Sequence, residues 1–246
     1  VDVEVTLGAR AGFSLTTTAT PESYFGSDDG TALATAMGGS GNFSFTWNTG
    51  DTTTTLANLP AGTYIVTAID EDNGCIQSDT AVVDEGAKIQ LIVGNDTGCQ
   101  NGVAIVPVTV ENFFEVHSFA FTLNAGDGTV GTITGVTNVN PALTGFIANL
   151  LPLNNLGVVW TGNGAPQIFT DGTKLFDLQI LLSNSAVVGS AAPVTVVGVP
   201  VGIEFNQDSL GVPVIVPIDA TAGSATITCT ADAIEIGGDI QTWRLP

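Results

Sequence analysis

The chain has 246 residues, of which 11% are charged and 44% are hydrophobic. Four basic residues stand against 24 acidic ones, giving a formal net charge of −20 at pH 7. This charge repels phosphate backbones and anionic lipid headgroups, which excludes nucleic acids and membrane surfaces as partners. The apolar residues form short runs, and none approaches the ~20 consecutive apolar residues that a membrane-spanning helix needs.

Thr, Ser, Gly and Val dominate the remaining composition, and the apolar residues alternate with polar ones between glycine-rich turns. This pattern is typical of many short strands joined by tight turns. A chain of this length holds about two domains on the usual size prior. The sequence therefore predicts an all-β protein made of two tandem β-sandwich domains with orphan strands at both ends.

Residues 1–14 are expected to form a leading strand that is shared with a preceding or neighbouring module. The segment Val1–Leu7 alternates with a period of two and begins without a preceding turn. We therefore expect it to pair with a strand from outside its own domain.

The segment from Gly38 to Gly50 is the most informative stretch of the first half. Phe43, Phe45 and Trp47 alternate with hydroxyl residues, so the three rings share one face of a strand. Glycine-rich turns bound the segment on both sides. We predict that Trp47 is buried between two sheets.

Residues 15–86 resemble the SprB-type repeat, an immunoglobulin-like or PKD-like module of the giant surface adhesins of gliding bacteria. The resemblance rests on Gly38–Gly50, on Leu59–Ala68 and on the Asn-Gly-Cys turn that ends at Cys75. It implies a small extracellular β-sandwich.

The boundary between the two domains is expected near Gly86. There the alternating strand that ends at Val83 gives way to two acidic residues and a glycine, and another strand begins at Lys88. Residues 87–231 then carry about nine strand signals without sustained helical periodicity. Such a set of strands is expected to form a two-sheet sandwich such as a jelly roll.

The order of strands in residues 87–231 resembles a cohesin-like domain. The landmarks are Val106–Val110, Val116–Leu123, Val158–Thr161 and Asp171–Leu178. The resemblance implies a binding or scaffolding fold, since cohesins hold dockerins in cellulosomes. The sequence itself lacks the duplicated calcium loop of a dockerin.

Residues 232–246 are expected to form a trailing strand that joins the next module or subunit. An unpaired strand edge promotes aggregation unless another strand covers it. Either the chain is one period of a tandem repeat, or each subunit donates an end strand to its neighbour in a fibre. The residues expected at this junction are Val1, Val3, Val5, Ile234, Ile236, Ile240 and Trp243.

Three cysteines leave one without a partner. The SprB-type repeat has a cysteine before its first glycine turn, but Tyr24 stands there, so Cys75 has lost its usual partner. Because the first and last strands of cohesin-like sandwiches run side by side, that resemblance implies a Cys99–Cys229 disulfide in an oxidising compartment. A Cys75–Cys99 bridge and three free thiols stay open as alternatives.

Two acidic clusters have the ligand chemistry of a calcium site. Asp28 and Asp29 precede a glycine, and Asp70 and Asp72 lie in a second acidic turn. Ca²⁺ prefers carboxylate and amide oxygens of this kind. Asp and Asn beside Gly are equally typical of ordinary turns that hold no metal, so we expect no obligatory cofactor.

Catalysis is not expected. The chain has one histidine, His117, on an alternating strand whose pleat directs Ser118 to the opposite face. No acidic residue lies in a motif that distinguishes it as a general acid or base. We therefore interpret His117 as an outward-facing strand residue and the protein as a non-enzyme.

These observations favour an extracellular, cell-surface role. The main hypothesis is a structural or adhesive repeat unit of a filament or stalk, assembled end to end with copies of itself or with flanking repeats by β-strand pairing. The alternative is a ligand-binding module that recognises a protein partner or a polysaccharide. Exposed aromatic rings, with Trp160 and Trp243 as candidates, would favour a polysaccharide.

Overall fold

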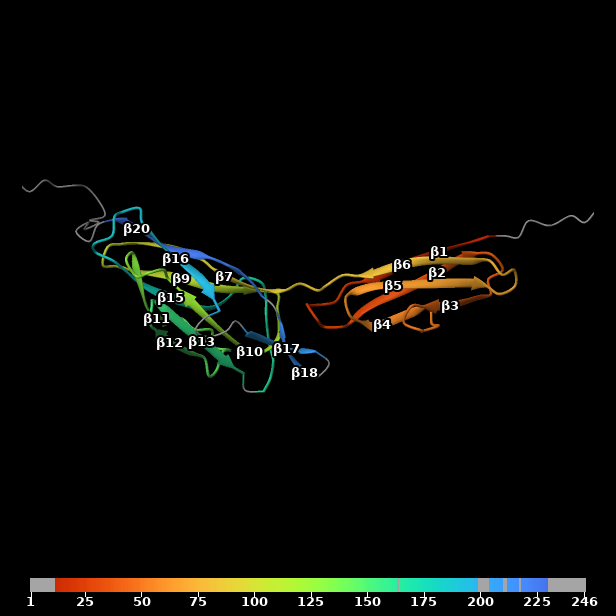
Figure 1. Cartoon of the computed structure of the whole chain (residues 1–246). Helices are drawn as coiled ribbons and strands as arrows, with labels where there is room; N and C mark the ends of the chain where they lie inside the picture. The colour runs from red at the N-terminus through yellow and green to blue at the C-terminus, as the bar shows by residue number, and fades with distance from the viewer. Residues whose placement is uncertain (1–11, 163, 199–203, 210–211, 217, 230–246) are drawn as a thin grey trace, which may run out of the picture. The chain divides into compact units, whose positions relative to one another are not determined.

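The computed structural model describes residues 12–162, 164–198, 204–209, 212–216 and 218–229. All regular elements in these ranges are β-strands (Figure 1). The chain divides into two compact units, of which the first comprises Val1–Ala87 and Ser209–Val212 and the second comprises Lys88–Asp208 and Pro213–Pro246. Among the described residues, no helix is long and apolar enough to cross a membrane.

The first unit is a sandwich of two three-stranded sheets. One sheet has the order β1-β2-β4 and the other the order β3-β5-β6, and all pairs are antiparallel. The strands are β1 (Phe13–Thr20), β2 (Gly30–Gly38), β3 (Phe43–Trp47), β4 (Thr55–Leu59), β5 (Gly62–Asp70) and β6 (Ile76–Val83).

Trp47 lies at the centre of this unit, as the alternation in β3 predicts. Its side chain is 2% exposed and packs in one core with Leu56, Tyr64 and Val66. The indole Nε1 donates a hydrogen bond of 2.8 Å to the carbonyl of Thr53, so burial leaves this polar group paired.

The division of strands matches that of an immunoglobulin-type sandwich, in which the first, second and fifth strands face the third, sixth and seventh. Two further features agree with this architecture. Trp47 is buried on the third strand, and Tyr64, near the start of β5, donates a 2.8 Å hydrogen bond to the carbonyl of Pro60. Such a bond to the backbone a few residues upstream is the tyrosine corner of these folds.

The second unit holds the remaining strands. They are β7 (Ile89–Val93), β8 (Asn95–Cys99), β9 (Val103–Glu111), β10 (Phe113–Asn124), β11 (Gly131–Thr137), β12 (Ile147–Leu151), β13 (Asn155–Thr161), β14 (Gln167–Phe169), β15 (Thr173–Leu182), β16 (Ala191–Val197), β17 (Glu204–Ser209), β18 (Val212–Val216), β19 (Ile218–Thr221) and β20 (Gly223–Cys229).

These strands form two sheets. The main path of the larger sheet is β12-β13-β10-β16-β20-β8, and β14, β17 and β18 lie off it. The smaller sheet has the order β11-β15-β9-β7-β19. Most pairs are antiparallel, but β19 runs parallel to β7 and β20 runs parallel to β8. The beginning and the end of the unit therefore lie together in both sheets.

Aromatic rings fill the space between the two sheets. Phe119, Phe121 and Phe205 stack on one another, and Phe176 reaches Phe121 from the facing sheet with a ring-centroid distance of 6.3 Å. Trp160 is 1% exposed and contacts Phe119. Such a core supplies most of the stabilisation of a β-sandwich, because each aromatic side chain removes about 150–250 Å² of surface from water.

The Trp47→Ala variant is expected to lose about 3–5 kcal/mol of unfolding free energy, because it creates a large cavity and leaves the Thr53 carbonyl without its donor. This loss is comparable with the whole stability of a small domain. Chemical denaturation measures it, with Thr46→Ala on the exposed side of β3 as the control. A Trp47→Ala loss no larger than that of the control would contradict this account of the core.

Candidate binding surfaces

His117 does not lie on a regular pleat. The pairing of β10 with β17 shifts register between Val116 and Ser118, so alternation is interrupted at His117, which is half-buried. The expectation that His117 faces outward on a regular strand is therefore wrong, because the bulge interrupts the period of two. Ser118 Oγ accepts a 2.8 Å hydrogen bond from Asn206 Nδ2.

The first acidic cluster is organised by hydrogen bonds within its own turn. The Asp29 carboxylate accepts hydrogen bonds from the backbone N–H and hydroxyl of Ser23. Burial acts in the opposite direction, but these bonds and one from the Ser27 hydroxyl lower the pKa of Asp29 below its ordinary value. Burial, followed by the nearby carboxylate of Glu22, raises the pKa of Asp28.

Glu22 connects this turn to the end of the first unit. Its carboxylate accepts hydrogen bonds from the backbone N–H groups of Gly26 at 3.1 Å, Asp28 at 3.2 Å and Ala61 at 3.2 Å. The carboxylate oxygens therefore stabilise the loop itself.

Asp70 is the most deeply buried residue of the second acidic cluster. Its carboxylate accepts hydrogen bonds from the hydroxyl of Ser40 at 2.6 Å, from the backbone of Asp72 at 3.2 Å and from Asn73 Nδ2 at 2.8 Å. The Ser40 hydroxyl is the main cause that lowers the pKa of Asp70. Asp72 Oδ1 accepts a 3.1 Å hydrogen bond from Asn42.

The structure does not bring Asp28 and Asp29 together with Asp70 and Asp72. In the described part of the chain, no group of three or more His, Cys, Asp and Glu residues is arranged to hold a metal ion. The carboxylates of Asp29, Asp70 and Asp72 accept hydrogen bonds from neighbouring serine and asparagine residues. Calcium binding at these four residues stays a prediction.

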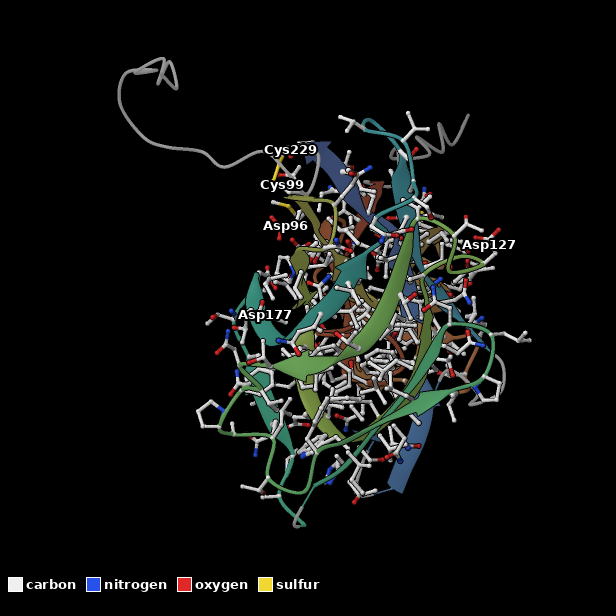
Figure 2. All side chains as sticks on the ribbon, turned by 90° about the vertical axis from the view of Figure 1, so that its left-hand side faces the viewer. Asp96, Cys99, Asp127, Asp177 and Cys229 are labelled. Carbon is white, nitrogen blue, oxygen red and sulfur yellow. A yellow bond between two sulfur atoms is a disulfide. The ribbon has the colours of Figure 1, made fainter. Side chains whose placement is uncertain are left out.

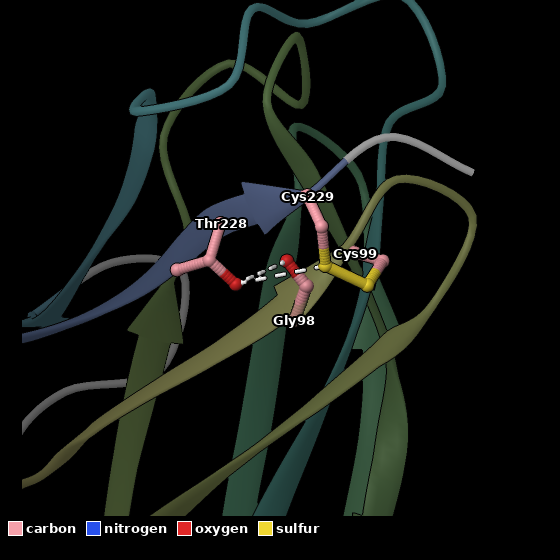
Figure 3. Close-up of a disulfide and its surroundings, with 4 residues drawn as sticks. All are labelled: Gly98, Cys99, Thr228 and Cys229. Carbon is pink, nitrogen blue, oxygen red and sulfur yellow. Dashed lines mark hydrogen bonds between the residues drawn. A yellow bond between two sulfur atoms is a disulfide. The ribbon is translucent and has the colours of Figure 1, made fainter. Parts of the chain in front are cut away.

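Cys99 and Cys229 form a disulfide bond between β8 and β20 (Figure 3). The two strands run parallel and the cysteines are register partners, with a Cα–Cα distance of 4.4 Å. The backbone N–H of Gln100 donates a 2.9 Å hydrogen bond to the carbonyl of Cys229, and Thr228 Oγ1 contacts the carbonyl of Gly98. Cys75 carries a free thiol.

The residues expected at an end-to-end junction all lie outside the described residues. They are Val1, Val3, Val5, Ile234, Ile236, Ile240 and Trp243. Pairing between the chain ends, the leading strand in residues 1–14 and the trailing strand in residues 232–246 stay predictions.

Aromatic side chains do not form an exposed row on the described surface. Trp160 is buried, and its Nε1 donates a 3.1 Å hydrogen bond to the carbonyl of Thr144. Of the Phe, Tyr and Trp side chains in the described ranges, Phe114 alone is exposed. A polysaccharide site therefore lacks the stacking platform on which we would place it.

Charge is distributed unevenly over the second unit. Residues 128–170 contain no Asp, Glu, Lys, Arg or His, although the whole chain has 28 Asp, Glu, Lys and Arg residues. This segment supplies β11, β12, β13 and β14. Acidic residues such as Asp96, Asp127 and Asp177 lie outside it, away from the packed centre of the sandwich (Figure 2).

An uncharged surface covers the outer side of β12, β13 and β10. Phe119, Phe121 and Leu123 of β10 point into the core, so the residues between them point outward. The register aligns these outward positions with those of β13 and β12. We call this set the uncharged face; it comprises Ala120, Asn124, Ile147, Asn149, Leu151, Asn155 and Val159, whereas Thr122 and Gly157, which share its register, are buried.

An apolar tip lies at one end of the uncharged face. Leu153, in the turn between β12 and β13, is 85% exposed and has a φ of 61°, a conformation that bulky residues rarely adopt. Its carbonyl accepts a 3.1 Å hydrogen bond from Asn124 Nδ2, and Asn155 Nδ2 donates to the carbonyl of Pro152. Strained backbone that neighbouring groups hold in place occurs preferentially at functional sites.

The uncharged face was missed in the sequence analysis. Its members come from three strands, and no motif joins Ala120 to Asn149 or Val159. The signal that was available is the charge-free run of residues 128–170, which stands out in a chain of net charge −20.

No protein-family model matches the chain, and no curated protein sequence matches it. Among solved structures, the seventh ScaB type I cohesin from Pseudobacteroides cellulosolvens matches with a TM-score of 0.50 and 17% identity, over 59% of this chain and 96% of that one. The third ScaC cohesin from Acetivibrio cellulolyticus, solved in complex with a dockerin, matches with a TM-score of 0.48 and 18% identity, over 57% and 99%. A non-cellulosomal cohesin from Archaeoglobus fulgidus matches with a TM-score of 0.45 and 20% identity, over 58% and 92%.

These shares of 57–59% exceed the length of the first unit, so each of the three matches must extend over the second. The Pseudobacteroides cohesin is 17% identical to this chain, so the match shows a shared fold alone. The second unit is a cohesin-like β-sandwich. The all-β fold class and the cohesin-like part of the expected resemblance are thereby confirmed. None of the matches reported above concerns the SprB-type repeat.

Asp70→Asn is expected to lower the melting temperature of the first unit by several degrees at pH 7, because the carboxylate accepts hydrogen bonds that the amide cannot fully replace. The folded-state pKa of Asp70 is lowered, so its contribution is present above the ordinary value of 3.8 and is lost as pH falls through the folded-state value. The difference between wild type and variant should therefore shrink below about pH 4. Calorimetry from pH 7 to pH 2 measures this difference in melting temperature, and the exposed Asp51→Asn is the control. A difference between wild type and Asp70→Asn that did not depend on pH would contradict the account.

Proposed function

We propose that the second unit is a protein-binding module and that the uncharged face is its docking surface. The observation that carries the proposal is this face itself: a sheet surface of small polar and apolar side chains in a strongly acidic chain. The cores of protein interfaces are depleted of charged residues, whereas ordinary surfaces are not.

The shape of the uncharged face suits a partner that presents a flat or helical surface. Ile147 is exposed at one margin of the face and Leu153 at its tip, while Thr122 and Gly157 at the centre are buried. The exposed apolar side chains offer a partner apolar contacts at the border of the face. The cohesin fold supports this function, because a structure such as the Acetivibrio cohesin was solved with a dockerin bound.

An extracellular, cell-surface location is part of the proposal. The Cys99–Cys229 disulfide supports it, since such bonds persist in oxidising compartments. The sequence resemblance of the first unit to the SprB-type repeat points to the same compartment. No described residue adds support for catalysis.

A structural or adhesive role in a stalk is the second candidate. It is favoured by two β-sandwich units that follow each other in one chain and by the disulfide that joins the first and last parts of the second unit. End-to-end assembly through the chain termini belongs to this candidate and is a proposal only.

The docking surface is tested by capturing partners from the culture medium and cell-surface extract of the source organism on the immobilised protein. We expect a specific partner to bind the wild type and to bind Val159→Glu about ten-fold more weakly or not at all, because the new carboxylate would be buried without a partner in the interface. Thr109→Glu is the matched control, since Thr109 lies half-buried on a central strand of the other sheet.

Equal binding by all three proteins would contradict the assignment of the uncharged face. Equal loss in both variants would contradict it as well, because a face-specific effect requires that Thr109→Glu behaves as the wild type. Circular dichroism first establishes that each variant is folded.

A further inference from the structure

The two sheets of the second unit have four edges on their main paths, and three of them are protected. Strand β8 carries Asp96 and the disulfide, and β19 is four residues long with the exposed Asp219. Strand β11 shifts register between Ile133 and Gly135. Charges, short length and bulges are the means by which proteins keep sheet edges from pairing.

A side chain also covers part of the β11 edge. Asn154 Oδ1 accepts a 2.8 Å hydrogen bond from the backbone N–H of Ile133, and its Nδ2 donates to the carbonyl of Gly131 at 2.9 Å. Two backbone groups of this edge are thus already paired. The ribbon β17-β18 lies off the main path, and β18 contains Pro213, which cannot donate a backbone hydrogen bond.

The fourth edge, β12, has neither a charge nor a bulge. Among the described strands it pairs only with β13, and this pairing runs from Ile147 to Leu151 without a register shift. It contains no charged residue, and Ile147 and Leu150 are 53% and 56% exposed. Regular, apolar and uncharged edges are those that accept another strand.

We propose that β12 is a self-association site, at which two copies of the chain pair their β12 strands antiparallel about a two-fold axis beside Asn149. This inference goes beyond the proposed function, because it uses the backbone edge of β12 and a second copy of this chain; the side chains of Ile147, Asn149 and Leu151 belong to the uncharged face as well.

The charge distribution favours a second copy as the occupant. Two chains of net charge −20 repel each other, and a partner with basic residues is attracted to the acidic surfaces. The charge-free segment 128–170 is where two acidic chains approach with the smallest Coulomb repulsion. An uncharged edge on a strongly acidic protein therefore suits an equally acidic partner.

The strand is also complementary to itself. With the axis beside Asn149, Ile147 lies opposite Leu151 of the second copy, and Ala148 lies opposite Leu150. Each large side chain thereby meets an apolar residue, and cross-strand pairs of this kind stabilise an antiparallel pair. An interface of identical strands about a two-fold axis is closed, so it gives dimers and not open fibres.

The association is expected to be weak. A five-residue strand pair covers less surface than the roughly 1,200–2,000 Å² of stable complexes. In a tandem arrangement on a surface, many such contacts would act together through their high effective concentration. Measurement on the isolated chain must therefore extend to high protein concentration.

The test uses sedimentation velocity of the full chain over a wide concentration range. The wild type should shift reversibly from monomer to dimer. Asn149→Lys and Asn149→Glu should each abolish the shift, because like charges then lie directly opposite each other across the axis. An equimolar mixture of the two variants should restore dimers, and at lower concentration than the wild type, since the opposed charges attract.

Thr132→Lys is the matched control, because Thr132 is exposed on the other edge strand of the same uncharged segment. It should dimerise as the wild type does. A wild type that stays monomeric at all concentrations, or Asn149 variants that dimerise normally, would overturn the proposal. Loss in both variants without recovery in the mixture would overturn the two-fold register.

Failure of this proposal and failure of the docking surface are distinguishable. Asn149 lies on the uncharged face as well as on β12, so Val159→Glu, which changes the face on β13 alone, should dimerise as the wild type does. A chain that is monomeric but binds its partner through Val159 leaves the proposed function intact. A chain that dimerises but captures no partner contradicts the docking surface and leaves β12 as the self-association site.

Discussion

The second unit depends on how its first and last strands are held together. Strand β19 runs parallel to β7 in one sheet, β20 runs parallel to β8 in the other, and the Cys99–Cys229 disulfide joins β8 to β20. Through these pairings β19 and β20 join strands that precede them by more than a hundred residues in sequence. Closing a loop of 130 residues contributes about 4–5 kcal/mol in the chain-entropy model. The long-range contacts of β9, β10 and β15 form within this closed loop.

Closure of this kind leaves the opposite margin of the sandwich free for binding. The disulfide and Asp96 protect the β8 edge, and the β12 edge at the other end of the same sheet carries no charge. The acidic residues keep the chain soluble and repel most copies of itself. The uncharged segment interrupts this repulsion at one place, where an exposed face, an apolar tip at Leu153 and an unprotected edge occur together.

The alternation of aromatic and hydroxyl residues along the chain predicted which side of a strand is buried. Trp47 is buried because three aromatic residues alternate with hydroxyl residues on one strand. The bulge at His117 could not be predicted, because it arises from pairing with a strand almost ninety residues later. The uncharged face and the protection of β11 by Asn154 could not be predicted for the same reason, because both depend on the register of strands that are distant in sequence. The Asp70 carboxylate shows a further limit: sequence identifies oxygen ligands, but only the structure shows that Ser40 and Asn73 already bind them.

The central claim is that this protein contacts other proteins through the uncharged face and the β12 edge. Hydrogen–deuterium exchange of the wild type at low and high protein concentration tests it most directly, because an edge strand gains backbone hydrogen bonds when another strand pairs with it. The account predicts that amides of Ile147–Leu151 become protected as concentration rises, while those of β8 and β19 do not change. Protection confined to other strands, with the β12 amides unchanged, would contradict it.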